Sequence, residues 1–202
     1  MTHSATKIAI VIPAAGASRR MRGTDKLLER VDGQLLLRGV TDRACAVAER
    51  VIVTVPNTTS PRADAVASMP VTLVPIPDAK DGMSASLRHG VRLVGSGVDG
   101  VMILPADMPD ITVEDLRAMI AAFVPSTILQ ATSEDGTPGH PVIFPKTLLS
   151  DFVHLTGDAG ARSILQRNRD HLHHIALPAQ HALTDLDTPE AWDAWRADNP
   201  GR

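Results

Sequence analysis

Short apolar runs alternate with longer segments of helical periodicity along almost the whole chain. Continuous runs of β-branched and aliphatic residues, each ended by proline or polar residues, predict strands buried on both faces. Between these runs, apolar residues recur every three or four positions, which is typical of amphipathic helices. The predicted strands are 7–12, 51–55, 71–74, 100–104, 126–131 and 141–144. The predicted helices are 35–49, 62–68, 82–94 and 113–123.

This alternation predicts an α/β fold: a single, doubly wound, mostly parallel sheet, formed by residues 1–202 as one domain. Thr112 to Asp115 has the sequence of a capping box and marks the start of the helix at 113. Ligands of open parallel sheets bind outside the carboxyl ends of the strands. We therefore expect the binding site in the segments that follow strands 7–12 and 100–104, and at the helix that begins at Gly82.

Composition narrows the class of protein. Hydrophobic residues make up 44% of the 202 positions but aromatic residues only 2%, so the core must be aliphatic. The single cysteine, Cys45, excludes an internal disulfide. The apolar run before Pro13 is too short to span a membrane and does not resemble a signal peptide, which predicts a cytoplasmic protein without a membrane partner. A net charge of −3 argues against a nucleic-acid partner.

The charges are unevenly distributed along the chain. Residues 1–30 carry six basic and two acidic side chains, a balance of +4, whereas residues 185–198 carry one basic and five acidic side chains, a balance of −4. A basic and an acidic segment together would suit a site that binds phosphate and a divalent cation. Two solvated surfaces would explain the same charges equally well.

The loop after the first predicted strand combines small residues with basic ones. Its small residues would let the main chain approach a ligand so that N–H groups surround phosphate oxygens. Arg20 and Lys26 could neutralise the charge of a triphosphate. The loop has neither a dinucleotide fingerprint nor a P-loop, and a flexible basic surface loop is the alternative. The small residues are Ala14, Ala15 and Gly16.

Asp107 lies just past the predicted strand 100–104, which would hold its carboxylate at the ligand edge of the sheet. Mg²⁺ typically takes one or two carboxylates together with substrate phosphates, so Asp107 is a candidate metal ligand. The alternative is that Asp107 or Asp110 caps the next helix. Thr112 already provides a cap, which favours the metal ligand.

The predicted helix at Gly82 begins with small polar residues. Its free N–H groups and the hydroxyls of Ser84 and Ser86 could bind a nucleotide, although serines in a first turn are usually caps. Met83 and Leu87 are expected to face the core.

Two later segments contain further candidate ligands. His140 and Arg162 could contact a phosphate or a heterocycle, although a histidine before proline is more often structural and Arg162 could pair with Asp158. Asp185 and Asp187 alternate along an extended stretch, and Asp187 is the preferred second Mg²⁺ ligand. The alternative there is an ordinary helix start with Thr188 as the N-cap.

A cluster of histidines also invites a metal hypothesis. No cysteine lies near His171, His173 and His174. The solvated end of a strand explains them better than a Zn²⁺ site does.

Taken in order, these segments resemble the motifs of the MobA-like NTP transferases. Residues 12–26 resemble Leu-Ala-Ala-Gly-x-Ser-x-Arg-Met-Gly-x-x-Lys, with Ile12-Pro13 for Leu-Ala and Arg22 inserted after Met21. Residues 82–87 resemble Gly-x-x-x-Ser-Leu. Residues 106–109 resemble Gly-Asp-Gln-Pro, with Ala106 for Gly and Met108 for Gln.

Three later motifs extend the resemblance, which runs from Ile8 to Trp192. Residues 139–141 and 157–162 match the Gly-His-Pro and Gly-Asp-x-Gly-Ala-Arg motifs of the molybdenum cofactor cytidylyltransferases. Residues 185–191 are similar to the terminal Asp-x-Asp-Thr-Pro-Glu-Asp segment of the family.

The resemblance implies a Rossmann-like nucleotidyltransferase fold and a Mg²⁺-dependent reaction. CMP would pass from CTP to the phosphate of a molybdopterin-type acceptor, with release of pyrophosphate and delivery to an apo-molybdoenzyme or its chaperone. Residues 14–16 look more like the CTP-using branch than the Ala-Gly-Gly of the GTP-using one. The implied catalytic residues are Lys26, Arg20 and Asp107, and the implied metal ligands are Asp107 and Asp187. The implied nucleotide-binding residues are Ala14, Ala15, Gly16, Gly82, Ser84 and Ser86, and the implied acceptor-binding residues are His140, Pro141, Asp158 and Arg162.

Two alternative functions remain at this point. One is a nucleotidyltransferase with another acceptor, such as a sugar phosphate. The other is a nucleotide-dependent oxidoreductase or a binding module on the same fold. The missing Gly-x-Gly-x-x-Gly argues against the oxidoreductase, and Lys26 with Asp107 argues against an inactive scaffold.

Overall fold

A seven-stranded sheet with the order β5-β4-β1-β6-β8-β7-β9 forms the centre of the molecule. The computed structural model describes residues 6–77 and 82–202. Only β8 runs antiparallel to its neighbours in this sheet, which confirms the predicted mostly parallel arrangement. The strands are β1 Ile8–Pro13, β4 Val51–Val55, β5 Thr72–Pro75, β6 Gly100–Ile103, β7 Ile128–Thr132, β8 Pro138–Pro145 and β9 Leu172–Ala176. A separate two-stranded ribbon pairs β2 Arg30–Val31 with β3 Gln34–Leu35.

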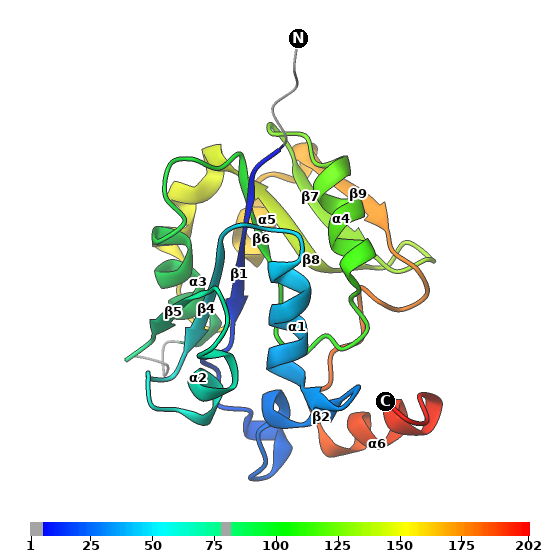
Figure 1. Ribbon diagram of the computed structural model, residues 1–202. Coiled ribbons are helices and arrows are strands. Elements are labelled where there is room, and N and C mark those ends of the chain that lie inside the picture. The colour runs from blue at the N-terminus through cyan, green and yellow to red at the C-terminus, as the bar shows by residue number, and fades with distance from the viewer. Residues whose placement is uncertain (1–5, 78–81) are drawn as a thin grey trace.

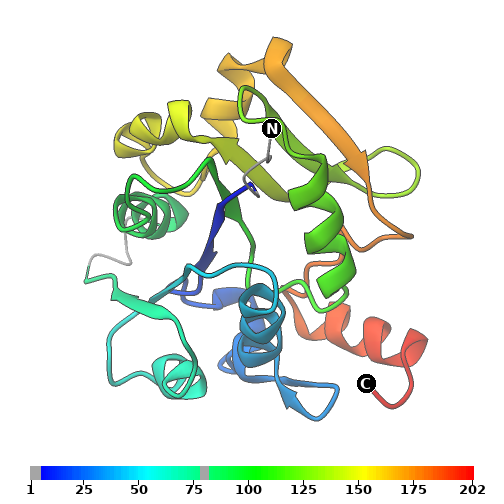
Figure 2. The same cartoon turned by 45° about the horizontal axis from the view of Figure 1, so that its top comes forward.

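Helices cover both faces of the sheet. Figures 1 and 2 show α1 and α4 on one side and α3 on the other. The α-helices are α1 Leu36–Cys45, α2 Pro61–Val66, α3 Gly82–Arg92, α4 Val113–Ala122, α5 Arg162–Arg167 and α6 Pro189–Asp198. The 3₁₀ segments are η1 Arg19–Met21, η2 Lys26–Leu28, η4 Lys146–His154 and η5 Arg169–His171. In the described ranges, no helix is both long enough and apolar enough to cross a membrane.

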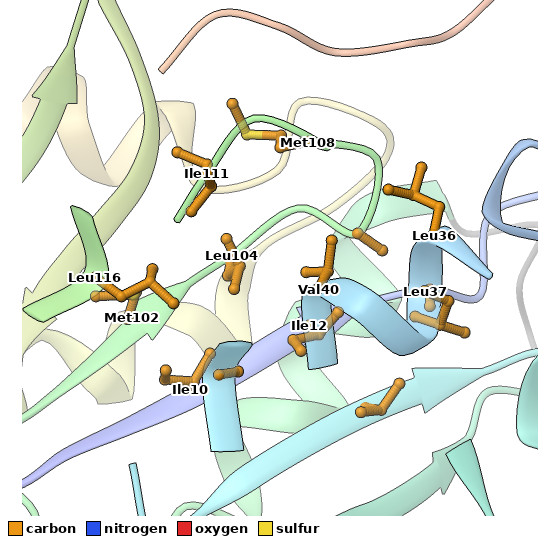
Figure 3. Packing of buried hydrophobic residues seen from close by; sticks show 14 of the residues in the cluster. Ile10, Ile12, Leu36, Leu37, Val40, Met102, Leu104, Met108, Ile111 and Leu116 are labelled. Carbon is orange, nitrogen blue, oxygen red and sulfur yellow. The ribbon is translucent and has the colours of Figure 1, made fainter. Parts of the chain in front are cut away.

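The central strand β1 supplies side chains to two separate aliphatic cores. Ile10 and Ile12 point toward α1 and α4, where they pack among residues such as Val40 and Leu116 (Figure 3). Val11, between them, points the opposite way into a second core with α3. Because side chains alternate along a strand, a continuously apolar run like this one fits only a sheet covered on both faces.

The predicted elements all occur, with ends that shift by a few residues. The capping box at Thr112 is confirmed, since its hydroxyl accepts the Asp115 N–H at 3.1 Å and the Asp115 carboxylate accepts the Thr112 N–H at 2.8 Å. Thr188 likewise caps α6. The short helix α5 was not predicted, and of β9 only a solvated strand end at His173 and His174 was expected. Their sequences lack a periodic apolar pattern, because β9 is a largely exposed edge strand and α5 has few residues.

The strand order determines where a ligand can enter. The chain leaves β1 toward β4 on one side and returns through α3 to β6 on the other side, so a crevice forms beyond the carboxyl ends of β1 and β6. Since β8 is antiparallel to β6 and pairs Val142 with Ile103, its first residues lie at that same edge. The loops after β1 and β6 and the start of β8 therefore meet.

Candidate active site at the carboxyl edge of the sheet

A cleft of about 980 Å³ lies at this edge of the sheet. It is lined by the loops that follow β1 and β6, the first turn of α3, the start of β8, and the segments around residues 158–162 and 182–187. Most of the residues predicted for the site line this one cleft. They are Ala14, Gly16, Arg20, Lys26, Gly82, Ser86, Asp107, His140, Asp158, Arg162 and Asp187.

Lys26 lies at the centre of a charged cluster in the cleft. Its Nζ donates to Asp107 Oδ2 and to Asp187 Oδ1, although the three residues lie far apart in the sequence. Only 13% of the Lys26 side chain is exposed. Burial opposes its charge, but the carboxylates of Asp107 and Asp187 outweigh that effect and raise the pKa of the ammonium above its ordinary value of 10.5. Lys26 is therefore a permanent cation in the cleft.

The basic N-terminal segment and the acidic C-terminal segment meet at this cluster. Arg20 pairs with Asp187 at 2.5 Å from a largely exposed position. Just outside the cleft, Arg22 pairs with Glu190 at 2.6 Å. The uneven charges along the chain therefore form one site rather than two separate solvated surfaces.

The carboxylates of the cluster fit a divalent cation. Asp107 and Asp187 direct oxygens at the same ammonium, so their negative charges already converge on one point. Asp185 lines the cleft beside them, and burial, followed by the charges of Asp107 and Asp187, raises its pKa above the ordinary 3.8. Across residues 6–77 and 82–202, no three His, Cys, Asp or Glu side chains form a complete metal cage. Two carboxylates are nevertheless the protein share that Mg²⁺ takes when substrate phosphates supply further oxygens.

The alternation predicted for the C-terminal segment is present. Asp185 and Asp187 line the cleft, whereas Leu186 between them is buried. Asp110 is not a helix cap. Its carboxylate accepts from Trp195 Nε1 at 3.2 Å and from Arg202 Nη1 at 2.8 Å.

The first turn of α3 contacts the segment at residues 157–158. Gly82 has φ +69°, and a Cβ there would collide with the Asp158 carboxylate, so only glycine allows this approach. The Ser84 N–H donates to Gly157 O at 3.2 Å. The first turn of α3, predicted to bind the nucleotide, therefore contacts the segment with Asp158, predicted to bind the acceptor, at the wall of one cleft.

Some predicted roles on α3 and β1 are wrong in detail. The Ser84 side chain is fully buried on the inner face of α3 and does not line the cleft. Of the two predicted serines, only Ser86 lines the cleft. Met83, expected in the core, is 41% exposed and lines the cleft. The methyl group of Ala15 packs into the core that contains α3, so only its main chain is available to a ligand.

The far wall of the cleft is formed by the start of β8 and by α5. His140 is an exposed residue that lines the cleft. Protein atoms around the cleft partly desolvate the charged ring and lower its pKa below the ordinary 6.5, against the opposing effect of Asp107 and Asp185. Pro141 is buried in β8 and does not line the cleft. In the described part of the chain, Arg162 makes no ion pair with Asp158, which leaves its guanidinium available to an anion.

Two polar side chains in the wall of the cleft were missed by the sequence analysis. Gln130 of β7 donates from Nε2 to Gly139 O at 3.0 Å and lines the far wall. Arg62 of α2 contacts the loop that follows β1. Neither belongs to a motif that could have identified it. His173 and His174 are exposed on β9 and do not line the cleft.

Comparison with known proteins identifies relatives over most of the chain. Residues 10–174 match the model of the MobA-like NTP transferase domain. Purine catabolism protein PucB of Bacillus subtilis (strain 168) is 35% identical over 122 residues, which are 59% of this chain and 58% of PucB. This chain therefore spans less than two thirds of the length of PucB. The probable molybdenum cofactor guanylyltransferase of Rhodopirellula baltica is 27% identical over 190 residues, 89% of this chain and 87% of that protein.

A solved structure shows the same fold. Rv0371c from Mycobacterium tuberculosis H37Rv superposes with a TM-score of 0.79 at 26% identity, covering 95% of this chain and 98% of its own. Its complex with manganese superposes with a TM-score of 0.77 over 94% of this chain and 97% of that one. On the match over residues 10–174, supported by the fold and the cleft, the chain belongs to the MobA-like NTP transferase domain family and is a nucleotidyltransferase.

Proposed function

We propose that this protein transfers CMP from CTP to the phosphate of a molybdopterin-type acceptor in the cytoplasm and releases pyrophosphate. The observation that carries this proposal is the contact of Lys26 with Asp107 and Asp187 inside one cleft. The cleft also holds the small-residue loop after β1 on one wall and His140 with Arg162 on the other. It therefore offers a cationic place for a triphosphate and a separate polar place for an acceptor.

The proposed reaction is a single displacement at phosphorus. An oxygen of the acceptor phosphate attacks the α-phosphorus of the NTP, and the bond from that phosphorus to the bridging oxygen of pyrophosphate breaks with its electron pair. Such transfers depend mainly on positioning and on neutralising charge. Lys26 would bind at the α-phosphate, and Arg20, more exposed, would bind the outer phosphates.

Asp107 and Asp187 are the residues that would hold a divalent cation. When bound, Mg²⁺ would neutralise phosphate oxygens and help to fix donor and acceptor in place. The manganese complex of Rv0371c supports a divalent cation in this fold.

The proposal also specifies the base of the nucleotide and the identity of the acceptor. Ala14, Ala15 and Gly16 support CTP, whereas the Rhodopirellula relative is named a guanylyltransferase, which supports GTP. PucB is named for purine catabolism, so an acceptor other than molybdopterin is the second candidate. The oxidoreductase alternative is set aside because the family is one of nucleotidyltransferases.

Calorimetry and pyrophosphate release with each NTP test these points. We expect CTP with Mg²⁺ to bind, and pyrophosphate to appear only when the molybdenum-loaded pterin is added. Pyrophosphate release with GTP but not with CTP would change the assigned nucleotide from CTP to GTP. Release with a sugar phosphate but not with the pterin would correct the acceptor.

Alanine variants test the site itself. Loss of one charge-stabilising contact typically lowers turnover by about 10²–10³. We expect Lys26→Ala and Asp107→Ala each to lose at least that much while remaining folded. Lys146→Ala and Asp151→Ala are matched controls, because neither residue lines the cleft. Wild-type turnover in both cleft variants would refute the site.

A further inference from the structure

Arg62 is a buried cation on the first turn of α2, and it is only 4% exposed. A guanidinium has five N–H donors, and here all five are used within the protein. Nε and Nη2 donate to the two oxygens of Asp25, at 2.6 and 2.8 Å. Nη1 donates to Ala14 O at 2.7 Å and to Gly16 O at 2.5 Å. The second Nη2 hydrogen goes to Ser18 Oγ at 2.8 Å.

Arg62 therefore has no donor left for a ligand, although it lies at the wall of the cleft. We propose that Arg62 is a positioning residue, which holds the loop after β1 in the conformation that binds the triphosphate. This inference rests on the proposed function and adds the residue that prepares its nucleotide site.

The geometry of the peptide groups shows how Arg62 acts. The carbonyls of Ala14 and Gly16 point at the guanidinium. In a trans peptide, the next N–H points the opposite way, and these peptides are trans. The N–H groups of Ala15 and Ala17 thus point away from Arg62.

These N–H groups are free to bind an anion. Within the described residues, the main-chain N–H groups of residues 15–18 have no hydrogen-bond partner. Residues 16–18 line the cleft. A run of free N–H groups in a concave loop is an anion-binding site.

The same guanidinium is linked to Lys26. Asp25, its ion-pair partner, precedes Lys26 and caps η2 by accepting the Leu27 N–H at 3.1 Å. Ser18, also held by Arg62, has the left-handed conformation with φ +46°, which needs support in a non-glycine residue. One buried side chain therefore fixes both the N–H groups and the start of the segment that carries Lys26.

Calorimetry of nucleotide binding tests this role with the variant Arg62→Lys. Lysine keeps the charge opposite Asp25, but its single ammonium cannot hold two carbonyls and a carboxylate in a fixed plane. We expect the Kd of CTP or GTP with Mg²⁺ to rise about tenfold or more, which corresponds to about 1.4 kcal/mol. In the transfer assay, the KM for the nucleotide should rise while the KM for the acceptor stays unchanged.

Arg50→Lys is the matched control. Arg50 also donates a guanidinium N–H to a main-chain carbonyl, that of Val94, but it precedes β4 and lies at the opposite end of the sheet from the cleft. The nucleotide Kd of the Arg50→Lys variant should equal that of the wild type. If Arg62→Lys does not fold, Arg62→Gln combined with Asp25→Asn removes both charges together and leaves neither buried alone.

The outcomes separate this inference from the proposed function. Equal and measurable nucleotide binding by wild type and the folded Arg62 variant overturns the role of Arg62 alone. Absence of nucleotide binding in the wild type overturns the proposed function, and the inference on Arg62 with it. In another outcome, the wild type binds nucleotide but transfers it to no acceptor, and the Arg62 variant binds nucleotide more weakly. That result supports the positioning role of Arg62 and overturns the transfer reaction. An equal rise in the KM of nucleotide and acceptor would also contradict a role limited to the loop.

Discussion

Single side chains neutralise one another in the cleft before any ligand arrives. The Lys26 ammonium lies where the carboxylates of Asp107 and Asp187 converge. A metal ion that uses these carboxylates must therefore compete with the lysine for their oxygens. Nucleotide phosphates would give Lys26 a new partner and so release the carboxylates.

Removal of the lysine should strengthen cation binding. We expect Lys26→Met to bind Mn²⁺ roughly tenfold more tightly than the wild type, about 1.4 kcal/mol, because two partly buried carboxylates lose their internal cation. Titration followed by electron paramagnetic resonance measures this affinity, with Lys146→Met as the control. Weaker or unchanged binding by Lys26→Met would show that these carboxylates do not hold the ion.

The lowered pKa of His140, which lines the cleft, predicts a pH effect on stability. Its pKa in the folded state lies below 6.5, the ordinary value that applies to the unfolded chain. As the pH falls below about 6.5, the unfolded chain takes up a proton that folded His140 resists, so the folded state loses stability; above that pH the effect is absent. The Tm of the wild type should therefore fall more between pH 8 and pH 5.5 than that of His140→Gln. Parallel Tm curves for the two proteins would contradict the lowered pKa of this ring.

At the scale of elements, the start of β8 contacts the residues that precede the acidic C-terminal segment 185–198. The His140 N–H donates to Ala182 O at 2.9 Å, and a Cβ on Gly139 would collide with that same carbonyl. The segment that carries Asp185 and Asp187 follows directly. Gly139 thus leaves room for the main chain that leads to these carboxylates.

Gly139→Ala should disturb the site through the backbone. Overpacking of this kind typically costs about 1–3 kcal/mol of unfolding free energy, and displacement of residues 182–187 should lower turnover at least tenfold. Urea denaturation and the transfer assay measure the two effects. Gly97→Ala is the control, since a Cβ there meets nothing within 4 Å and its φ is not positive. Normal turnover in Gly139→Ala would show that the carboxylates are held by other contacts.

The sequence predicted the strands and helices with strong periodicity and the residues that belong to motifs. β1 was recognisable because its apolar run is continuous, and Lys26 and Asp107 follow such runs. Arg62 was not, because a single arginine in a helical segment resembles a surface residue until the fold brings the loop after β1 against it. The sequence predicted Ser84 in the cleft and Met83 in the core, and the structure has the reverse. Neighbouring residues in the first turn of a helix point to different sides, so an error of one position exchanges the two assignments.

At the scale of the whole molecule, the C-terminal segment closes against the N-terminal half. In Figure 1, α6 lies beside the region of β2. Arg196 pairs with Glu29 at 2.8 Å, and Trp192 and Trp195 join the core that contains α1. The family match ends at residue 174, so this segment, with Asp187, lies beyond it.

Arg202 provides a test of this closure. It pairs with Asp110 at 2.8 Å and Asp32 at 3.0 Å, and its guanidinium lies 4.8 Å from the ring centroid of Trp195. Because the side chain is about one third exposed, we expect Arg202→Gln to lower the free energy of unfolding by only about 1 kcal/mol. Turnover should be unchanged, as Arg202 does not line the cleft. A loss of turnover without a loss of stability would contradict this structural role.

The spacing of the charged cluster along the chain has a consequence for folding. Lys26 is separated from Asp107 by 81 positions and from Asp187 by 161. Contacts between such distant residues close long loops, and they form only when the strands and helices between them have assembled. A partly folded molecule would therefore lack the whole charged cluster, and turnover would report complete folding.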